Sequence, residues 1–338
     1  MQYRILGKTG LKVSAVGFGG IPIQRIDARG TRALMERLVE KGVNYIDTAR
    51  GYTVSESYLG EALSGGLREK FILATKSMSR GYADMARDIG ISLSNLRTDY
   101  IDLYQLHNIK SDADFELAFS AEGAVAAIQD AIRAGKVGHL GATAHSVDSF
   151  ERLLSYPEIE TIMFPYNIVE SQGEALMERA AAQNVGVIAM KPLAGGNITD
   201  GTLAMRYILQ NKTCTLAIPG MATLEEIEQN TAAAEQDGPL TPEELAACEA
   251  IRAGLSGNFC RRCGYCAPCT VGINIALSNK FADLAEMAGE VPASVAAHYK
   301  AMDVTAGACI ACGDCEPRCP FDVPIIERME KTEELFGC

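Results

Sequence analysis

The sequence contains no tryptophan, and only 7% of its 338 residues are aromatic. A binding pocket lined by tryptophan is therefore excluded. No apolar run approaches the roughly 18 residues that span a bilayer, and the N-terminal residues carry no apolar segment typical of a signal peptide. We therefore expect a cytoplasmic protein that neither crosses a membrane nor is exported.

Basic residues are outnumbered by acidic ones. Lys and Arg total 31 against 43 Asp and Glu, which gives a net charge of −12 at pH 7. Such a surface repels phosphate backbones and anionic lipid headgroups, so we expect no nucleic-acid or membrane partner. The length, with 48% apolar residues, predicts about two domains and a sizeable core. It gives no indication of the oligomeric state.

Cysteine, in contrast, is abundant and clustered, since eight of the 11 cysteines fall in two runs near the C-terminus. The first run holds Cys260, Cys263, Cys266 and Cys269, and the second holds Cys309, Cys312, Cys315 and Cys319. The second run has the C-x2-C-x2-C-x3-C-P spacing of bacterial [4Fe–4S] ferredoxins. The first run has a shorter final spacing and Thr270 in place of the proline. We expect [4Fe–4S] clusters, two if both runs bind, in the reducing cytoplasm of an anaerobe.

Structural zinc and disulfides are the alternatives for these cysteines. Zinc sites usually pair two C-x2-C knuckles across a loop, whereas each run here already holds four thiols. Disulfides between cysteines three residues apart have poor geometry. In two-cluster ferredoxins the fourth cysteine of a run ligates the other cluster. That pattern would group Cys260, Cys263 and Cys266 with Cys319, and Cys309, Cys312 and Cys315 with Cys269, the ligand that the spacing supports least.

The first two-thirds of the chain alternates between short apolar runs and helical patterns. Strands are expected at 16–19, 43–47, 71–75, 100–106, 137–142, 161–164, 185–190 and 214–218, and helices at 31–41, 55–64, 82–96, 122–134, 149–155, 173–184, 203–211 and 224–234. Eight such alternations predict an α/β fold, a (β/α)8 TIM barrel. A doubly wound sheet is the alternative, but the G-x-G-x-x-G fingerprint is absent.

Local signals place the domain limits. Residues 3–6 and 12–14 flank a turn at 8–10 and predict a hairpin that covers the barrel floor. Thr223 with Glu226, and Thr241 with Glu244, fit capping boxes at helix starts. A Gly-containing stretch at 253–257 predicts a hinge. We therefore expect a barrel domain at 1–255 and a small α-helical ferredoxin-like iron–sulfur domain at 256–338, with helices at 275–288 and 293–303.

Four polar residues fall at the carboxyl ends of consecutive expected strands, where barrel enzymes carry their chemistry. They are Asp47, Tyr52, Lys76 and His107. Tyr52 could protonate a carbonyl oxygen, a charged Lys76 would favour its ionised form, and Asp47 would keep Lys76 charged. His107 could orient and polarise the carbonyl as a neutral donor. The set predicts an oxidoreductase for a small carbonyl-type substrate.

Residues 6–20, 47–52, 73–76 and 102–107 resemble the aldo/keto reductase family, and the similarity continues through 136–143, 165–167 and 217–220. The whole chain is similar to the branch that carries a C-terminal [4Fe–4S] ferredoxin-type domain. The resemblance implies a TIM barrel that binds NAD(P)H without a Rossmann fold, and it gives the four residues the roles above. It implies cofactor contacts from Thr143, Asn167, Met190, Pro192, Leu193, Pro219, Gly220, Met221, Glu226, Gln229 and Asn230.

The sequence departs from the family pattern at the cofactor site. Met190 stands where many relatives have an aromatic residue that stacks on the nicotinamide. Gly220 and Glu226 stand where NADP-selective members carry Lys and Arg, although Glu226 also fits the capping box. A preference for NADP is therefore not predicted, and the choice between NAD and NADP stays open.

The two halves of the chain handle electrons differently. Nicotinamide transfers a hydride, while each cluster accepts one electron. A flavin in the barrel could split the pair, or a ferredoxin or flavoprotein partner could exchange single electrons with the clusters. The clusters could also be structural. The alternative function is a non-catalytic redox or oxygen-sensing module on the same scaffold.

Overall fold

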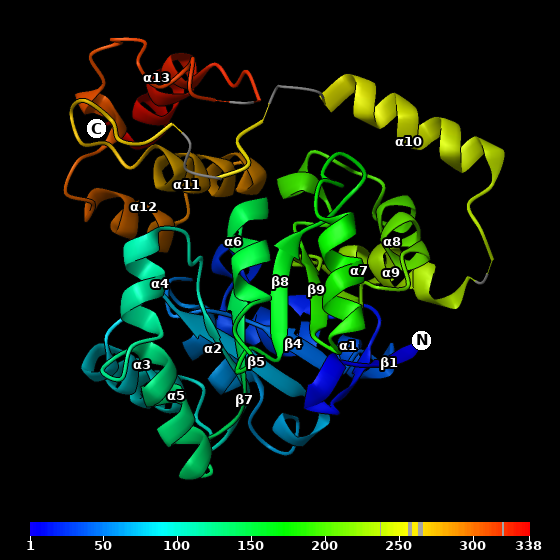
Figure 1. Cartoon of the computed structure of the whole chain (residues 1–338). Helices are drawn as coiled ribbons and strands as arrows, with labels where there is room; N and C mark the ends of the chain where they lie inside the picture. The colour runs from blue at the N-terminus through cyan, green and yellow to red at the C-terminus, as the bar shows by residue number, and fades with distance from the viewer. Residues whose placement is uncertain (237, 256–258, 263–265, 320) are drawn as a thin grey trace. The chain divides into compact units, whose positions relative to one another are not determined.

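The computed structural model describes residues 1–236, 238–255, 259–262, 266–319 and 321–338 (Figure 1). The chain divides into two compact units, the first made of Met1–Ala194 and Ile198–Cys248 and the second of Gly195–Asn197 and Glu249–Cys338. The expected boundary after residue 255 and the last two residues of the expected hinge, 256 and 257, reach into residues 256–258, which lie outside the described residues. The first three hinge residues, 253–255, are helical, and both the boundary and the hinge stay predictions. No helix in the described ranges is long and apolar enough to cross a bilayer.

The first unit is built on an eight-stranded parallel sheet in which the strands follow chain order. The strands are β3 (Phe18–Gly19), β4 (Tyr45–Asp47), β5 (Ile72–Ser77), β6 (Ile101–Leu106), β7 (Val137–Thr143), β8 (Thr161–Pro165), β9 (Gly186–Met190) and β10 (Leu216–Ala217). Parallel bridges join Val16 to Ala217 and Gly19 to Gly220, so the first and last strands meet. The predicted barrel is confirmed, and each expected strand is present.

The strands are connected by the helices α1 (Ala28–Glu40), α2 (Ser55–Ala62), α3 (Tyr82–Asn95), α4 (Asp112–Ala118), α5 (Ala124–Arg133), α6 (Val147–Leu153), α7 (Glu174–Ala182) and α8 (Gly201–Gln210). Helices α9 (Leu224–Ala232) and α10 (Pro242–Leu255) follow the last strand. Both expected capping boxes form, at Thr223 with Glu226 and at Thr241 with Glu244. Helix α4 was not expected. It begins with a further capping box, in which the Ser111 side chain accepts from the backbone of Asp114.

The expected hairpin covers one end of the barrel. Strands β1 (Tyr3–Ile5) and β2 (Lys12–Ser14) pair antiparallel, and Leu6 between them is fully buried in the interior cluster that includes Tyr45 and Leu103. Gly7 adopts φ +52°, and a Cβ there would lie 2.3 Å from the backbone nitrogen of Gly186. The turn therefore packs backbone to backbone against β9, leaving the opposite end of the barrel for the strand-end residues.

The second unit is helical, with no strand among its described residues. It contains α11 (Ile275–Ala288), α12 (Ala293–Lys300) and α13 (Ile325–Phe336). The Tyr299 ring stacks on Phe336 with centroids 4.0 Å apart and meets Phe281 edge-on. Helix α11 has the expected bounds, α12 ends three residues earlier than expected, and α13, which follows the second cysteine run, was not expected.

Candidate functional site

The four residues expected at the strand ends come from three adjacent strands. Asp47 is the last residue of β4, Lys76 lies near the end of β5, and His107 directly follows β6, while Tyr52 lies in the loop after β4. Asp47 and Lys76 are 2% and 1% exposed. Parallel pairing of β4 with β5 and of β5 with β6 sets these strand ends side by side.

Lys76 is the centre of this group. Its ammonium forms an ion pair with Asp47 Oδ1 and donates to the Thr48 carbonyl oxygen at 2.8 Å. It also lies 4.8 Å from the centroid of the Tyr52 ring, and that ring meets the His107 ring edge-on with centroids 5.9 Å apart. The structure therefore brings together all four residues that were singled out from the sequence.

Two opposing effects decide the charge of Lys76. Burial by itself lowers the pKa of a lysine, because the low-dielectric interior disfavours the cation. The charges and hydrogen bonds of Asp47 and Tyr52 outweigh burial, and the pKa of Lys76 is raised above its ordinary value. The site thus holds a stable cation beside the Tyr52 phenol.

Gln105 is a member of the site that the sequence reasoning missed. It is fully buried on β6, and its Nε2 donates to Asp47 Oδ2 at 3.0 Å. The two carboxylate oxygens of Asp47 are thereby divided between Lys76 and Gln105. Side chains two residues apart on a strand share a face, so the position two residues before His107 could have been recognised.

A buried carboxylate, Glu56 on α2, supports the loop that carries Tyr52. Its Oε1 accepts from the hydroxyls of Thr75 and Ser92, each at 2.8 Å. Its Oε2 accepts from Arg50 and Asn95, each at 3.1 Å. Arg50 belongs to the same loop as Tyr52, so Glu56 ties this loop to α2, α3 and β5.

Arg80 supports the chain at His107. One of its terminal nitrogens donates to the carbonyl oxygens of His107 at 2.9 Å and Asn108 at 3.0 Å. The backbone nitrogen of Asn108 donates to Thr143 Oγ1 at 2.7 Å, and the Asn108 side chain meets His145 Nδ1 at 3.0 Å. Thr143, an expected cofactor contact, therefore helps to fix the loop after β6.

Asn167 is buried and its amide is engaged within its own loop. Nδ2 donates to Glu170 Oε2 at 2.8 Å and to the Lys191 carbonyl oxygen at 2.9 Å. Oδ1 accepts from the backbone nitrogens of Val169 and Glu170 at 2.9 and 3.0 Å. Both donors and the acceptor are used, so a contact with a nicotinamide carboxamide would require one of these bonds to be exchanged.

The other expected cofactor residues follow β9 and β10. Met190 is partly buried at the end of β9 and packs on the barrel interior, with Pro192 and Leu193 just beyond it. Pro219 and Met221 flank Gly220 after β10, and Gln229 and Asn230 lie on α9, the first exposed and the second buried. These positions share the barrel end that carries Lys76.

Gly220 and Glu226 have local structural roles. A Cβ at Gly220 would lie 2.6 Å from Pro22 Cγ, so packing leaves no room for a side chain. Glu226 Oε2 accepts from the backbone nitrogens of Ala222 and Thr223 at 2.6 and 3.0 Å. Its other oxygen lies 3.9 Å from the Arg25 guanidinium. Glu226 therefore caps α9 and places a carboxylate beside Arg25.

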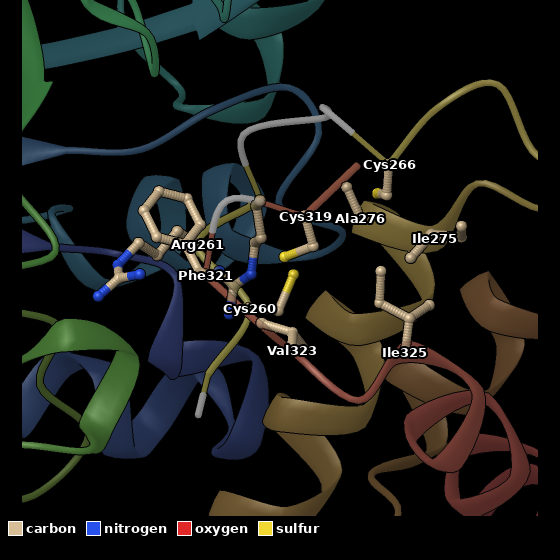
Figure 2. Close-up of a pocket in the computed structure, with 10 residues that line it drawn as sticks. Cys260, Arg261, Cys266, Ile275, Ala276, Cys319, Phe321, Val323 and Ile325 are labelled. Carbon is tan, nitrogen blue, oxygen red and sulfur yellow. The ribbon is translucent and has the colours of Figure 1, made fainter. Parts of the chain in front are cut away.

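The described cysteines of the two runs line two separate pockets in the second unit. The first pocket, which is partly open to solvent, is lined by Cys260, Cys266 and Cys319. Figure 2 shows the Cys260 and Cys319 sulfur atoms turned toward each other. Cys263 lies outside the described residues. One cysteine of the second run thus joins two of the first.

The second pocket, which is also partly open to solvent, is lined by Cys269, Cys309, Cys312 and Cys315. Ile275 and Ile325, at the starts of α11 and α13, line both pockets. Among the described residues, no three Cys, His, Asp or Glu side chains converge on a point as ligands of a single metal ion would. Thiols spread around a pocket fit a cuboidal cluster, in which each cysteine binds a different iron.

Two family models match the chain. Residues 15–202, more than half of the 338, match the Aldo/keto reductase family. Residues 259–324 match the 4Fe-4S dicluster domain. The two matches fall on the barrel and on the segment that carries the cysteine pockets.

Known proteins are similar over most of the barrel. L-galactose dehydrogenase of Arabidopsis thaliana is 28% identical over 306 residues, which covers 74% of this chain and 94% of that protein. Aldo-keto reductase YhdN of Bacillus subtilis is 26% identical over 229 residues, covering 62% and 67%. The holo form of aldo-keto reductase AKR11C1 from Bacillus halodurans superposes with a TM-score of 0.65 at 26% identity, covering 74% of this chain and 96% of that one.

Proposed function

Because the chain belongs to the aldo/keto reductase family and carries a C-terminal 4Fe-4S dicluster domain, we propose that it is an NAD(P)H-dependent reductase. The substrate class is an aldehyde, a ketone or a related unsaturated small molecule. The observation that carries the proposal is the convergence of Tyr52 and His107 on the buried Lys76–Asp47 pair. Chemistry of this kind needs a proton donor, a cation that activates it and an orienting donor at one place.

The proton in this reaction moves at the Tyr52 hydroxyl. When bound, NAD(P)H supplies the hydride for the carbonyl carbon. Tyr52 gives its proton to the carbonyl oxygen, and the adjacent Lys76 cation lowers the cost of the phenolate that remains. Asp47 keeps Lys76 charged and in place, as its burial and ion pair support. His107 holds the carbonyl oxygen by a hydrogen bond from its ring.

The cofactor is proposed to lie across the barrel end, against the residues after β9 and β10. Glu226 and the packed Gly220 offer no cation for the 2′-phosphate of NADPH, and the Glu226 carboxylate would repel that phosphate. The nearby cation, Arg25, lies beside the Glu226 carboxylate. We therefore expect NADH to be used at least as well as NADPH.

Two [4Fe–4S] clusters are proposed for the second unit. Cys260, Cys263, Cys266 and Cys319 would hold one cluster, and Cys269, Cys309, Cys312 and Cys315 would hold the other. The pockets support this grouping for every described cysteine in it. The clusters would carry single electrons to or from a ferredoxin or flavoprotein partner, and flavin content after anaerobic purification tests whether the chain itself splits electron pairs.

The test is anaerobic oxidation of NADH and NADPH with a panel of aldehydes and ketones. Tyr52→Phe should lower kcat/KM by roughly 10²- to 10⁴-fold, the usual contribution of a positioned proton donor. The matched control is Tyr58→Phe, which removes a hydroxyl from α2 without touching the site and should leave turnover unchanged. Full turnover in Tyr52→Phe would refute the assignment of Tyr52.

A further inference from the structure

The two cysteine pockets differ in charge. The first pocket is lined by Arg261 and Arg262 and by no acidic residue among those described. The second is lined by Asp314 and Arg318, whose charges cancel. Arginine does not lose its charge at any pH that a protein tolerates, so this difference is permanent.

Arg261 is fixed in place by two aromatic rings. Its guanidinium carbon lies 3.9 Å from the centroid of Phe321 and 4.6 Å from that of Phe259. Arg261 is only 8% exposed, and Figure 2 shows it beside Phe321 at the edge of the pocket. Low exposure reduces the screening of its charge by water and salt.

Arg262 adds a second cation to the lining of the first pocket. It pairs with Asp283 at 2.5 Å, but Arg328 pairs with the other oxygen of the same carboxylate at 2.6 Å. Two cations therefore share this one carboxylate. Arg261 and Arg262 together place two guanidinium groups in the described lining of the first pocket, whereas the lining of the second holds one guanidinium and one carboxylate.

Exposure also separates the pockets. Cys266 in the first pocket is 9% exposed. In the second, Cys312 is exposed, and Ile310, which also lines this pocket, is 61% exposed. A one-electron carrier can approach the second pocket closely, because one of its cysteines and a neighbouring apolar side chain lie at the surface of this unit.

Reduction of a cluster adds one negative charge, so nearby cations raise its reduction potential while burial lowers it. Resting on the proposed ligation of both clusters, we propose that Arg261 and Arg262 make the first-pocket cluster the one of higher potential. The two guanidinium groups in the first lining outweigh the effect of burial, because the low exposure of Arg261 strengthens its field as well. An electron from the one-electron carrier reduces the second-pocket cluster first. Its onward transfer re-oxidises that cluster and reduces the first-pocket cluster. The first-pocket cluster is thus the acceptor end of the pair.

The test is an anaerobic redox titration of the full chain followed by electron paramagnetic resonance. The wild-type protein should titrate in two steps. Arg261→Gln should shift only the higher potential to a more negative value, whereas Arg261→Lys, which keeps the charge, should shift it less. Arg318→Gln is the matched control at the second pocket and should shift only the lower potential. Iron and sulfide analysis separates the two proposals, since absent clusters would refute the ligation itself.

The inference would be overturned if Arg261→Gln kept full cluster occupancy and both reduction potentials were unchanged. A shift confined to the lower reduction potential would also overturn it. If Arg261→Gln fails to hold its clusters, Asp314→Asn gives the same test from the other side. This substitution keeps a polar group for the 2.9 Å bond from Thr270 and leaves Arg318 uncompensated. It should raise the lower potential and narrow the gap, and an unchanged gap would contradict the proposal.

Discussion

Replacing Lys76 by methionine perturbs the site at its centre. Methionine keeps much of the volume and removes the charge, so the Asp47 carboxylate, 2% exposed, loses its ion pair. Gln105 remains as a hydrogen-bond donor to the other carboxylate oxygen. The variant therefore isolates the cost of a buried carboxylate without its counter-ion.

The expected loss of stability is large for one substitution. Removing one partner of a buried ion pair costs roughly 3–5 kcal/mol, because the other charge stays buried and unpaired. In a domain of this size each kcal/mol lowers the melting temperature by about 2–4 °C, so the shift is on the order of 10 °C. The double variant Asp47→Asn/Lys76→Met removes both charges and keeps an amide oxygen that can accept the hydrogen bond from Gln105. Most of the lost stability should therefore be recovered.

Thermal unfolding of the anaerobic protein, followed by circular dichroism, measures the shift. The pKa of Lys76 is raised in the folded state, so its stabilising contribution is fully present below its ordinary pKa of 10.5 and is lost as the pH rises through the folded value. The difference in unfolding free energy between wild type and Lys76→Met should therefore narrow as the pH rises through the folded pKa of Lys76. A single variant within about 1 kcal/mol of wild type, or a double variant no more stable than the single, would refute the ion-pair reasoning.

Two further predictions concern Gln105 in the barrel site and Cys319 in the first cysteine pocket. Gln105→Leu removes a charge-assisted hydrogen bond of about 1.5–3 kcal/mol, so kcat/KM should fall roughly 10- to 100-fold. Wild-type kinetics in Gln105→Leu and in Gln105→Asn would refute a role for Gln105 in the site. Cys319→Ser should lose about half of the bound iron and sulfide if it ligates one of two clusters, while Cys338→Ser, outside both pockets, should lose none. Equal iron in both cysteine variants would contradict the grouping.

The sequence predicted the barrel and its catalytic candidates because both depend on local patterns. Strand ends in a parallel barrel meet at one rim, so Asp47, Lys76 and His107 could be brought together without coordinates. Gln105 shares their face of β6 but was missed, since a glutamine in an apolar strand has no obvious chemistry until its partner is known.

Other features depend on packing that the sequence does not display. Glu56 gathers partners from a loop, a strand and a neighbouring helix, a set that only the folded chain assembles. The engagement of the Asn167 amide by Glu170 and Lys191 arises from a local turn that no motif marked. The charge difference between the cysteine pockets likewise depends on Arg261 lying between Phe259 and Phe321, residues far apart in the chain.

The central claim is that the barrel site transfers a hydride directly to a carbonyl while Tyr52 supplies the proton. The most direct measurement is the fate of deuterium from C4-deuterated NADH, or NADPH if that is preferred, with an accepted aldehyde or ketone under anaerobic conditions. The account predicts deuterium on the former carbonyl carbon of the product. Product that instead takes this hydrogen from solvent water would contradict direct transfer, because electrons passing singly through the clusters leave the deuterium behind.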